Sequence, residues 1–315
     1  MSQLFVPKGI ALFSGVLIPC SFVVYVDWIK KIAASKIIKK KDDNDCDNIN
    51  EILDYELRTK HSYREAELKF FLPYSFIYLL ILLISFLIIG PYINFDLYEI
   101  YFSPKYSKSI REKFIGAAIV IIINFILYTG LLIQFILGNE KLLPKSSFCF
   151  FMENLYGPFL EEFIYRGILF TLFKQAEFNG IFSAVFSSLT FSVSHFRHVF
   201  DIYFDRSQIP HLFFQSFYTL LFGFYTCYAY NFSGTIFAPV ILHGVCNTLQ
   251  MPRVNYLKDS SLSKFKKNLI SFSYIFGIVS WILLIKKYHL LININYHKYF
   301  YLNFKVIIFI KFLLK

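Results

Sequence analysis

Long apolar runs separated by short polar segments extend over most of this 315-residue chain. Most runs are about 20 residues long, which lets one helix cross the ~30 Å hydrocarbon core of a bilayer. The pattern predicts membrane-spanning helices at residues 9–29, 70–93, 114–137, 154–173, 180–198, 211–230, 233–252 and 269–285. A further apolar stretch, 303–314, is too short to span and is expected to lie in the interface or to pack on the bundle. The predicted fold is an all-α, polytopic transmembrane helix bundle of about eight spans.

The longest polar segment lies between the first two predicted spans, at residues 30–69. It opens with KKIAASKIIKKK, continues through DDNDCDNIN and ends in a short helix predicted at about 50–68. Mixed charge of this kind is usually a solvated loop. We expect the chain to divide into a first span (1–29), this polar insert (30–69), two spans (70–137), a catalytic membrane core (154–252), and a last span with a basic tail (253–315).

Lysine and arginine counts orient the predicted spans, because cytoplasmic loops carry the positive excess. The insert at 30–69 holds ten of these residues and the loop at 253–268 holds five. The loops at 174–179 and 231–232 hold one and none. Alternation of the spans puts these two segments, which hold the most lysine and arginine, on the same side, which is therefore predicted to be cytoplasmic. The basic tail after residue 285 does not fit this count.

Composition agrees with a membrane protein and argues against other classes. Charged residues make up 17% of the chain and hydrophobic residues 56%, whereas soluble domains carry roughly 25% charged residues. We attribute the net charge of +11 to basic loops and expect no nucleic-acid partner. The five cysteines form no CxxC pair, which argues against a disulfide framework or a zinc knuckle. The apolar run after Lys8 continues to Ile29 without a clear cleavage site, so a retained span is expected.

Two adjacent carboxylates interrupt the span predicted at 154–173, in the stretch GPFLEEFIYRGILF. A charge at the bilayer centre costs about 2.5–3.5 kcal/mol even on the lenient insertion scale. Glu162 and Arg166 are four residues apart on one helix face and can form an ion pair. Glu161 lies about 100° round the helix from Glu162, so it can face a cavity. Because Glu162 is expected to pair with Arg166, the adjacent Glu161 has no local partner in the sequence, which favours a functional role for it over a structural one.

Polar residues also occur in two later spans. FSVSHFRH places His195 near the end of one span, and APVILHGVCN places His243 and Asn247 past the middle of another. Alternation of the spans brings these residues to the depth of Glu161, in the cytoplasmic half of the bundle. Burial around one water-filled cavity is the least costly arrangement for such groups. The sequence therefore predicts that three separate motifs converge.

These residues also have structural interpretations, as a buried ion pair, packing histidines and an interhelical amide. Together they favour hydrolysis, although neither GxSxG nor HExxH is present. Glu161 and His195 could take the proton of a water and make it a nucleophile. His243 and Asn247 could stabilise the oxyanion that forms. A metal is the competing interpretation, since Glu161, His195 and His243 could form a 2-His-1-carboxylate set.

The motifs resemble those of a known family of membrane proteases. GPFLEEFIYRG resembles the EExxxR motif of the type II CAAX prenyl endopeptidases, the Ras-converting endopeptidases, within the wider CPBP family of metal-independent intramembrane glutamate proteases. FSVSH matches that family's FxxxH motif and HGVCN its HxxxN motif. HFRH differs from the eukaryotic HFHH form at Arg197. The motifs come in the family's order and cover residues 157–252, so the insert at 30–69 is not included.

The resemblance implies a bundle in the endoplasmic reticulum membrane, with a conical catalytic cavity open to the cytosol. It implies removal of the C-terminal tripeptide from farnesylated or geranylgeranylated CAAX proteins, such as small GTPases, with no metal or other cofactor. The family's functional residues fall on a catalytic pair, an oxyanion-stabilising pair and a supporting pair, which are Glu161 and His195, His243 and Asn247, and Glu162 and Arg166.

Two alternatives stay open at this stage. The protein could be a family relative that cleaves other peptides or acts as a scaffold. It could also be a proton-coupled transporter whose glutamate and histidines relay protons. Many transporters carry inverted repeats, and no internal repeat is visible in this sequence.

Overall fold

The computed structural model describes residues 6–38, 71–88, 109–138, 146–196, 209–250 and 254–295, together with Glu65, Leu68 and Lys69. All regular structure within these ranges is helical, as the sequence predicts. In chain order the helices are α1 (Lys8–Ile38), a helix at Phe71–Ile88, α4 (Ile110–Leu127), α5 (Thr129–Gly138), α6 (Ser147–Phe151), η1 (Met152–Tyr156), α7 (Gly157–Glu162), η2 (Phe163–Phe170), α8 (Thr171–Gln175), α9 (Gly180–Ser194), α10 (Ile209–Ser233), α11 (Phe237–Leu249), η5 (Val254–Leu257) and α12 (Lys264–Asn295).

Some predicted features lie outside these residues. They are most of the polar insert, the residues Arg197 and His198, and the apolar stretch at 303–314. The predictions made for them therefore stay predictions. At the start of the insert, α1 continues to Ile38, beyond the predicted end of the first span.

Three of the described helical segments are long and apolar enough to cross a bilayer, at Lys8–Ile29, Phe71–Ile88 and Lys264–Tyr288. α4 and α5 meet at an angle of 51° and count as a fourth span if the bent pair crosses as one. The single span predicted at 114–137 is therefore a broken pair of helices. α9 and α11 are apolar but shorter. The prediction of membrane-spanning helices is thus supported, while the count of eight stays a prediction.

The stretch with the two adjacent carboxylates belongs to a helical region that runs through residues 147–175. Two of its segments, η1 and η2, have π-helical hydrogen bonding, and α7 with both glutamates lies between them. Such wide turns are frequent at functional sites. Every residue of η2 is buried, as expected for a helix that is enclosed on all sides. The charged motif is therefore in the interior of the bundle.

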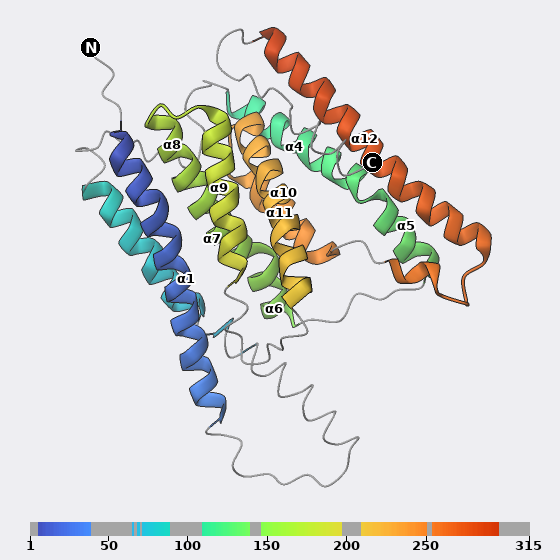
Figure 1. The fold of residues 1–315 in the computed structure, drawn as a ribbon, viewed down its shortest axis with the longest axis horizontal. Helices are drawn as coiled ribbons and strands as arrows, with labels where there is room; N and C mark the ends of the chain where they lie inside the picture. Colours follow the sequence, from blue (N-terminus) through green and yellow to red (C-terminus); the bar gives the residue numbers. More distant parts are fainter. Residues whose placement is uncertain are drawn as a thin grey trace.

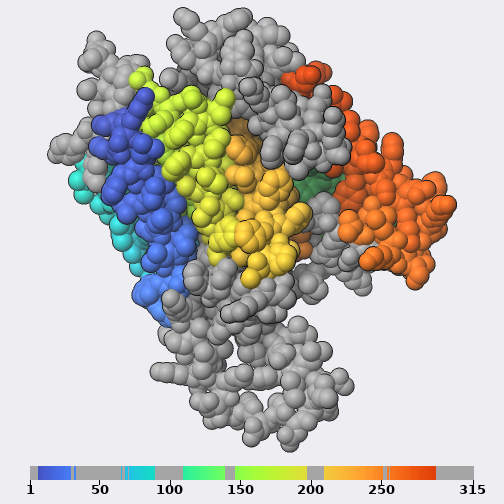
Figure 2. All heavy atoms as spheres, in the orientation of Figure 1, coloured from blue at the N-terminus to red at the C-terminus, as the bar shows by residue number. Residues whose placement is uncertain are grey.

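The motif helices occupy the centre of the fold. α1 and the Phe71–Ile88 helix lie on one side of α7 to α11, and α4, α5 and α12 lie on the other (Figure 1). On the face drawn in Figure 2, α9 lies between α1 and α10. One apolar cluster joins α1 to η2 and α9 through Phe22 and Tyr165, and another joins α4 to α10 through Val120 and Ala229. These two clusters hold the motif helices between them.

Two glycines allow helices to approach the motif residues closely. Gly244 of α11 lies against the backbone carbonyl of Asn154 in η1, with no space for a side chain. Gly223 of α10 faces Arg166, and a Cβ atom there would lie 3.1 Å from Nη2 and 2.8 Å from Cβ of Ser188. A larger residue at either position would push the backbone of α10 or α11 away from the motif helix.

Candidate active site

The ion pair predicted between Glu162 and Arg166 is present in the bundle interior, which confirms the spacing argument. Arg166 Nη1 donates to Glu162 Oε1 over 3.2 Å, and both side chains are fully buried. Glu162 Oε2, Arg166 Nε and Arg166 Nη2 are buried without a hydrogen-bond partner among the described residues. Desolvation offsets much of the attraction in such a pair. A contribution to stability alone therefore does not explain well why the buried Glu162–Arg166 ion pair is present.

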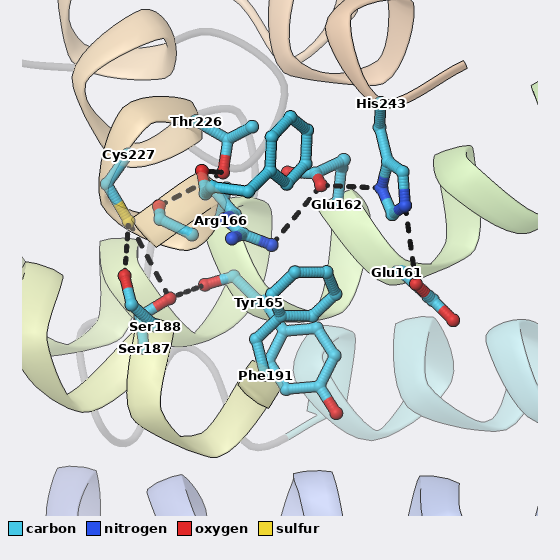
Figure 3. Close-up of polar contacts among 12 residues, drawn as sticks. Glu161, Glu162, Tyr165, Arg166, Ser187, Ser188, Phe191, Thr226, Cys227 and His243 are labelled. Carbon is cyan, nitrogen blue, oxygen red and sulfur yellow. Dashed lines mark hydrogen bonds and ion pairs between the residues drawn. The ribbon is translucent and has the colours of Figure 1, made fainter. Parts of the chain in front are cut away.

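His243 of α11 links this ion pair to the second glutamate (Figure 3). Its Nδ1 lies 2.9 Å from Glu162 Oε1, and its Nε2 lies 3.8 Å from Glu161 Oε2. An ionised carboxylate can only accept, so Nδ1 carries the hydrogen in the shorter contact. Arg166, Glu162, His243 and Glu161 thus form a continuous line of contacts, which we call the charged quartet. The Glu161 side chain is 15% exposed whereas Glu162 is 0% exposed, so Glu161 is the carboxylate nearer to solvent.

His195 follows the last turn of α9 as its capping residue. Its Nδ1 lies 2.9 Å from the backbone oxygen of Phe191. A carbonyl oxygen can only accept, so Nδ1–H donates, and Nε2 is the acceptor nitrogen of the neutral ring. The rings of His195 and His243 pack edge-on against Phe191, with centroid distances of 4.9 Å and 5.7 Å. The two predicted histidines therefore come together on one aromatic side chain.

Asn247 lies on the exposed side of α11 and donates from Nδ2 to the backbone oxygen of Glu153 over 2.9 Å. The next residue, Thr248, donates to Asn154 Oδ1 over 3.0 Å. Together with the close approach of Gly244, these bonds dock α11 on the π-helical segment η1. The bond to Glu153 uses one of the two hydrogens of the Asn247 amide, so the amide can still donate a second bond.

Sequence reasoning missed the small polar residues beside the buried arginine. Ser187 donates to the backbone oxygen of Tyr165 over 2.6 Å, and Ser188 lies 3.8 Å from the sulfur of Cys227 (Figure 3). The signal was present in the sequence, because α9 is rich in serine within an apolar helix. Serine is frequent where membrane helices pack closely. These residues let α9 and α10 approach Arg166.

The structure does not assemble the metal-ligand set that the sequence left open. Among the residues described, no group of three or more His, Cys, Asp or Glu side chains is placed to hold a metal ion. Glu161, His195 and His243, which could have formed a 2-His-1-carboxylate site, are therefore not placed as a metal-ligand set.

Comparison with known proteins shows which family the segment that carries the site resembles. A family model described as "Type II CAAX prenyl endopeptidase Rce1-like" matches residues 144–249, which contain every predicted site residue. This segment, about a third of the chain, is therefore similar to the Rce1-like family. The resemblance inferred from the three motifs is therefore confirmed. The Rce1-like segment includes α7, which carries Glu161 and Glu162, and α11, which carries His243 and Asn247.

Two curated relatives are both named CAAX prenyl protease 2. The human protein is 31% identical over 108 residues, which is 32% of this chain and 32% of the relative. The Arabidopsis thaliana protein is 28% identical over 150 residues, which is 46% of this chain and 45% of the relative. The chain thus matches about a third of one relative's length and less than half of the other's. No solved structure matches it significantly.

Proposed function

We propose that this protein is an intramembrane endopeptidase that removes the C-terminal tripeptide from prenylated CAAX proteins. The observation that carries the proposal is the charged quartet, which lies in the Rce1-like segment with Glu161 as its most exposed member. The names of the two relatives support the same reaction class. Glu161 is the carboxylate at the more exposed end of this line of charges and lies beside His243, an arrangement that suits hydrolysis by an activated water.

In the proposed reaction, Glu161 and His195 act on one water. Glu161 takes a proton from the water as its oxygen attacks the scissile carbonyl, and His195 Nε2 accepts a hydrogen bond that orients it. Glu161 then returns the proton to the amide nitrogen as the C–N bond breaks. The products are a prenylcysteine carboxylate and a free tripeptide, with no covalent intermediate.

His243 and Asn247 are proposed to stabilise the tetrahedral oxyanion. With Nδ1–H committed to Glu162, His243 can donate from Nε2 only when its ring is protonated. In that state the two glutamates, Arg166 and His243 carry no net charge, which lowers the cost of burying them together. The amide hydrogen of Asn247 that is not used by Glu153 supplies the second donor.

The proposed oxyanion role predicts a selective loss of turnover in Asn247→Ala. We expect kcat to fall by roughly 10²–10³ because a transition-state donor is removed, with KM little changed. Asn247→Asp should be no better, because a carboxylate would repel the oxyanion. The measurement is steady-state cleavage of a prenylated peptide.

The neighbouring variant Thr248→Val is a matched control for Asn247→Ala. It removes the bond from α11 to Asn154 but no proposed donor, so kcat should stay close to wild type. A rise in KM with unchanged kcat in Asn247→Ala would instead make Asn247 a substrate anchor.

The substrate class fits a protease embedded in lipid. A prenyl chain gains ~0.8 kcal/mol for each CH₂ that it buries in the bilayer, so the substrate is already concentrated at the membrane. We propose farnesylated or geranylgeranylated small GTPases as substrates, and the endoplasmic reticulum membrane, with the site facing the cytosol, as the location. The peptide would enter from water while the prenyl chain stays in lipid.

The direct test is incubation of the purified protein in detergent with a farnesylated CAAX peptide. Mass spectrometry should detect the released tripeptide and the shortened prenylated product. The same peptide without its prenyl group should be cleaved far more slowly. Absence of cleavage of any prenylated peptide, with the protein folded, would contradict the proposal.

Chelation tests whether the reaction needs a metal. We expect exhaustive treatment with a chelator to leave kcat unchanged, because the proposed base and oxyanion donors are all side chains. The measurement is peptide cleavage before and after dialysis against chelator. Loss of activity that added zinc restores would support a metalloprotease mechanism instead.

Glycosylation mapping tests the predicted orientation. The insert at 30–69 is rich in lysine and arginine and is expected on the cytoplasmic side. An acceptor site placed near residue 45 should therefore stay unmodified when the protein is made with microsomes. Modification at that site would contradict the predicted topology. An acceptor in the loop at 174–179, which is predicted on the opposite side of the membrane, should be modified and is the positive control.

A further inference from the structure

Phe191 lies where the three motif helices meet. Phe191 belongs to α9 and is 1% exposed. The guanidinium carbon of Arg166 lies 4.3 Å from the ring centre, and the ring centroids of His195 and His243 lie 4.9 Å and 5.7 Å away. Arg166 comes from η2 and His243 from α11. One apolar side chain therefore contacts a residue from each polar motif.

The face of this ring is placed to stabilise the buried arginine. Arg166 uses Nη1 for Glu162, while its Nε and Nη2 have no hydrogen-bond partner among the described residues. An aromatic face carries negative charge density, and its attraction for a cation increases when water is excluded. The cation–π contact with Phe191 thus offsets part of the cost of leaving Nε and Nη2 of Arg166 without hydrogen bonds.

The position of Arg166 is coupled to that of His243 through a single atom. Arg166 Nη1 and His243 Nδ1 both contact Glu162 Oε1, over 3.2 Å and 2.9 Å. A shift of the guanidinium therefore moves or reorients the oxygen that orients the His243 ring. In addition, the backbone oxygen of Phe191 accepts from His195 Nδ1 over 2.9 Å. Phe191 therefore helps to position both His195, of the proposed catalytic pair, and His243, of the proposed oxyanion-stabilising pair.

We propose that Phe191 is a positioning residue for the peptidase reaction proposed above, on which this inference rests. Its ring face holds Arg166 by a cation–π contact and so sets Glu162 and His243. The edge-on contacts with His195 and His243 keep the two imidazoles at a fixed separation. Phe191 does not contact the substrate in this scheme, so its loss should lower kcat and leave KM nearly unchanged.

The sharpest test replaces Phe191 by phenylalanines that carry one, two or three ring fluorines. Fluorine withdraws negative charge from the ring face while the shape is nearly kept, so a purely space-filling role would not respond. Phe173 is the matched control, because it is also buried and its ring packs against the rings of Phe178, Phe182 and Phe186. The measurements are kcat and KM for a farnesylated CAAX peptide, and the unfolding midpoint in detergent.

We expect kcat to fall stepwise with each fluorine at Phe191, to about a tenth of wild type for the trifluorinated ring, a change of ~1.4 kcal/mol in activation free energy. KM should stay constant, and the series at Phe173 should be flat. Phe191→Leu should be at least as slow as the trifluorinated ring, provided that it folds.

The outcomes separate this inference from the proposed function. If the wild type cleaves the peptide and the Phe191 series is as flat as the Phe173 series, the positioning role is wrong while the peptidase function stands. If the wild type cleaves no prenylated peptide, both proposals are overturned. A stepwise fall confined to Phe191 supports the inference.

Discussion

Replacing Glu161 by glutamine is expected to abolish peptide cleavage while the protein stays folded. Glutamine keeps the shape of the side chain but removes the base, and a general base contributes about 10²–10⁴ to the rate. His243 keeps its contact with Glu162 in this variant, so the change leaves it with a carboxylate partner. His195→Ala should have a similar effect, because it removes the second group proposed to hold the water. The measurement is kcat in the farnesylated-peptide assay.

A matched control for this change is Glu153→Gln. Glu153 lies in η1 of the same helical region, and its backbone oxygen, rather than its carboxylate, accepts the bond from Asn247. We expect Glu153→Gln to keep most of the activity. A Glu161→Gln protein with kcat near wild type would disprove the assignment of Glu161 as the base.

Replacing Arg166 by methionine is expected to cost about 3–5 kcal/mol of unfolding free energy, because it leaves Glu162 as a buried carboxylate without its cation. Both side chains are fully buried and 3.2 Å apart, so solvent cannot replace the lost partner. Peptide cleavage should also be lost, since Glu162 orients His243. The measurement is denaturant unfolding in detergent, with activity measured on the folded fraction.

The double variant of Arg166→Met with Glu162→Gln separates the cost of the unpaired charge from the value of the pair. It removes both charges and keeps an acceptor for His243 Nδ1, so most of the lost stability should return. Activity should stay low, because a neutral amide holds the histidine less firmly than a carboxylate does. A double variant as unstable as Arg166→Met would mean that packing by the arginine, rather than its charge, is what the fold requires.

The structure changes the interpretation of His243 more than that of any other predicted site residue. Its spacing with Asn247 suggested two donors on one helix face. In the structure, His243 points its two nitrogens toward the two glutamates, and Asn247 bonds to the backbone of η1. The oxyanion role of this pair therefore depends on the protonated state of His243 and on the second amide hydrogen of Asn247.

The sequence by itself determined the features that depend on local geometry. Four-residue spacing on a helix places two side chains on one face, so the pairing of Glu162 with Arg166 followed from the chain alone. Apolar runs likewise predicted the all-helical architecture, and three spaced motifs were enough to indicate the family.

Only the tertiary structure decided the contacts between helices. The 51° bend between α4 and α5, the docking of α11 on η1, and the link from Glu162 to His243 all depend on helix crossing angles and on close approach at residues such as Gly244. Many packing arrangements satisfy the same pattern of apolar positions, because that pattern fixes which face is buried but not its partner. The place of Phe191 between Arg166 and the two histidines belongs to this class, since it requires three helices to be in position at once.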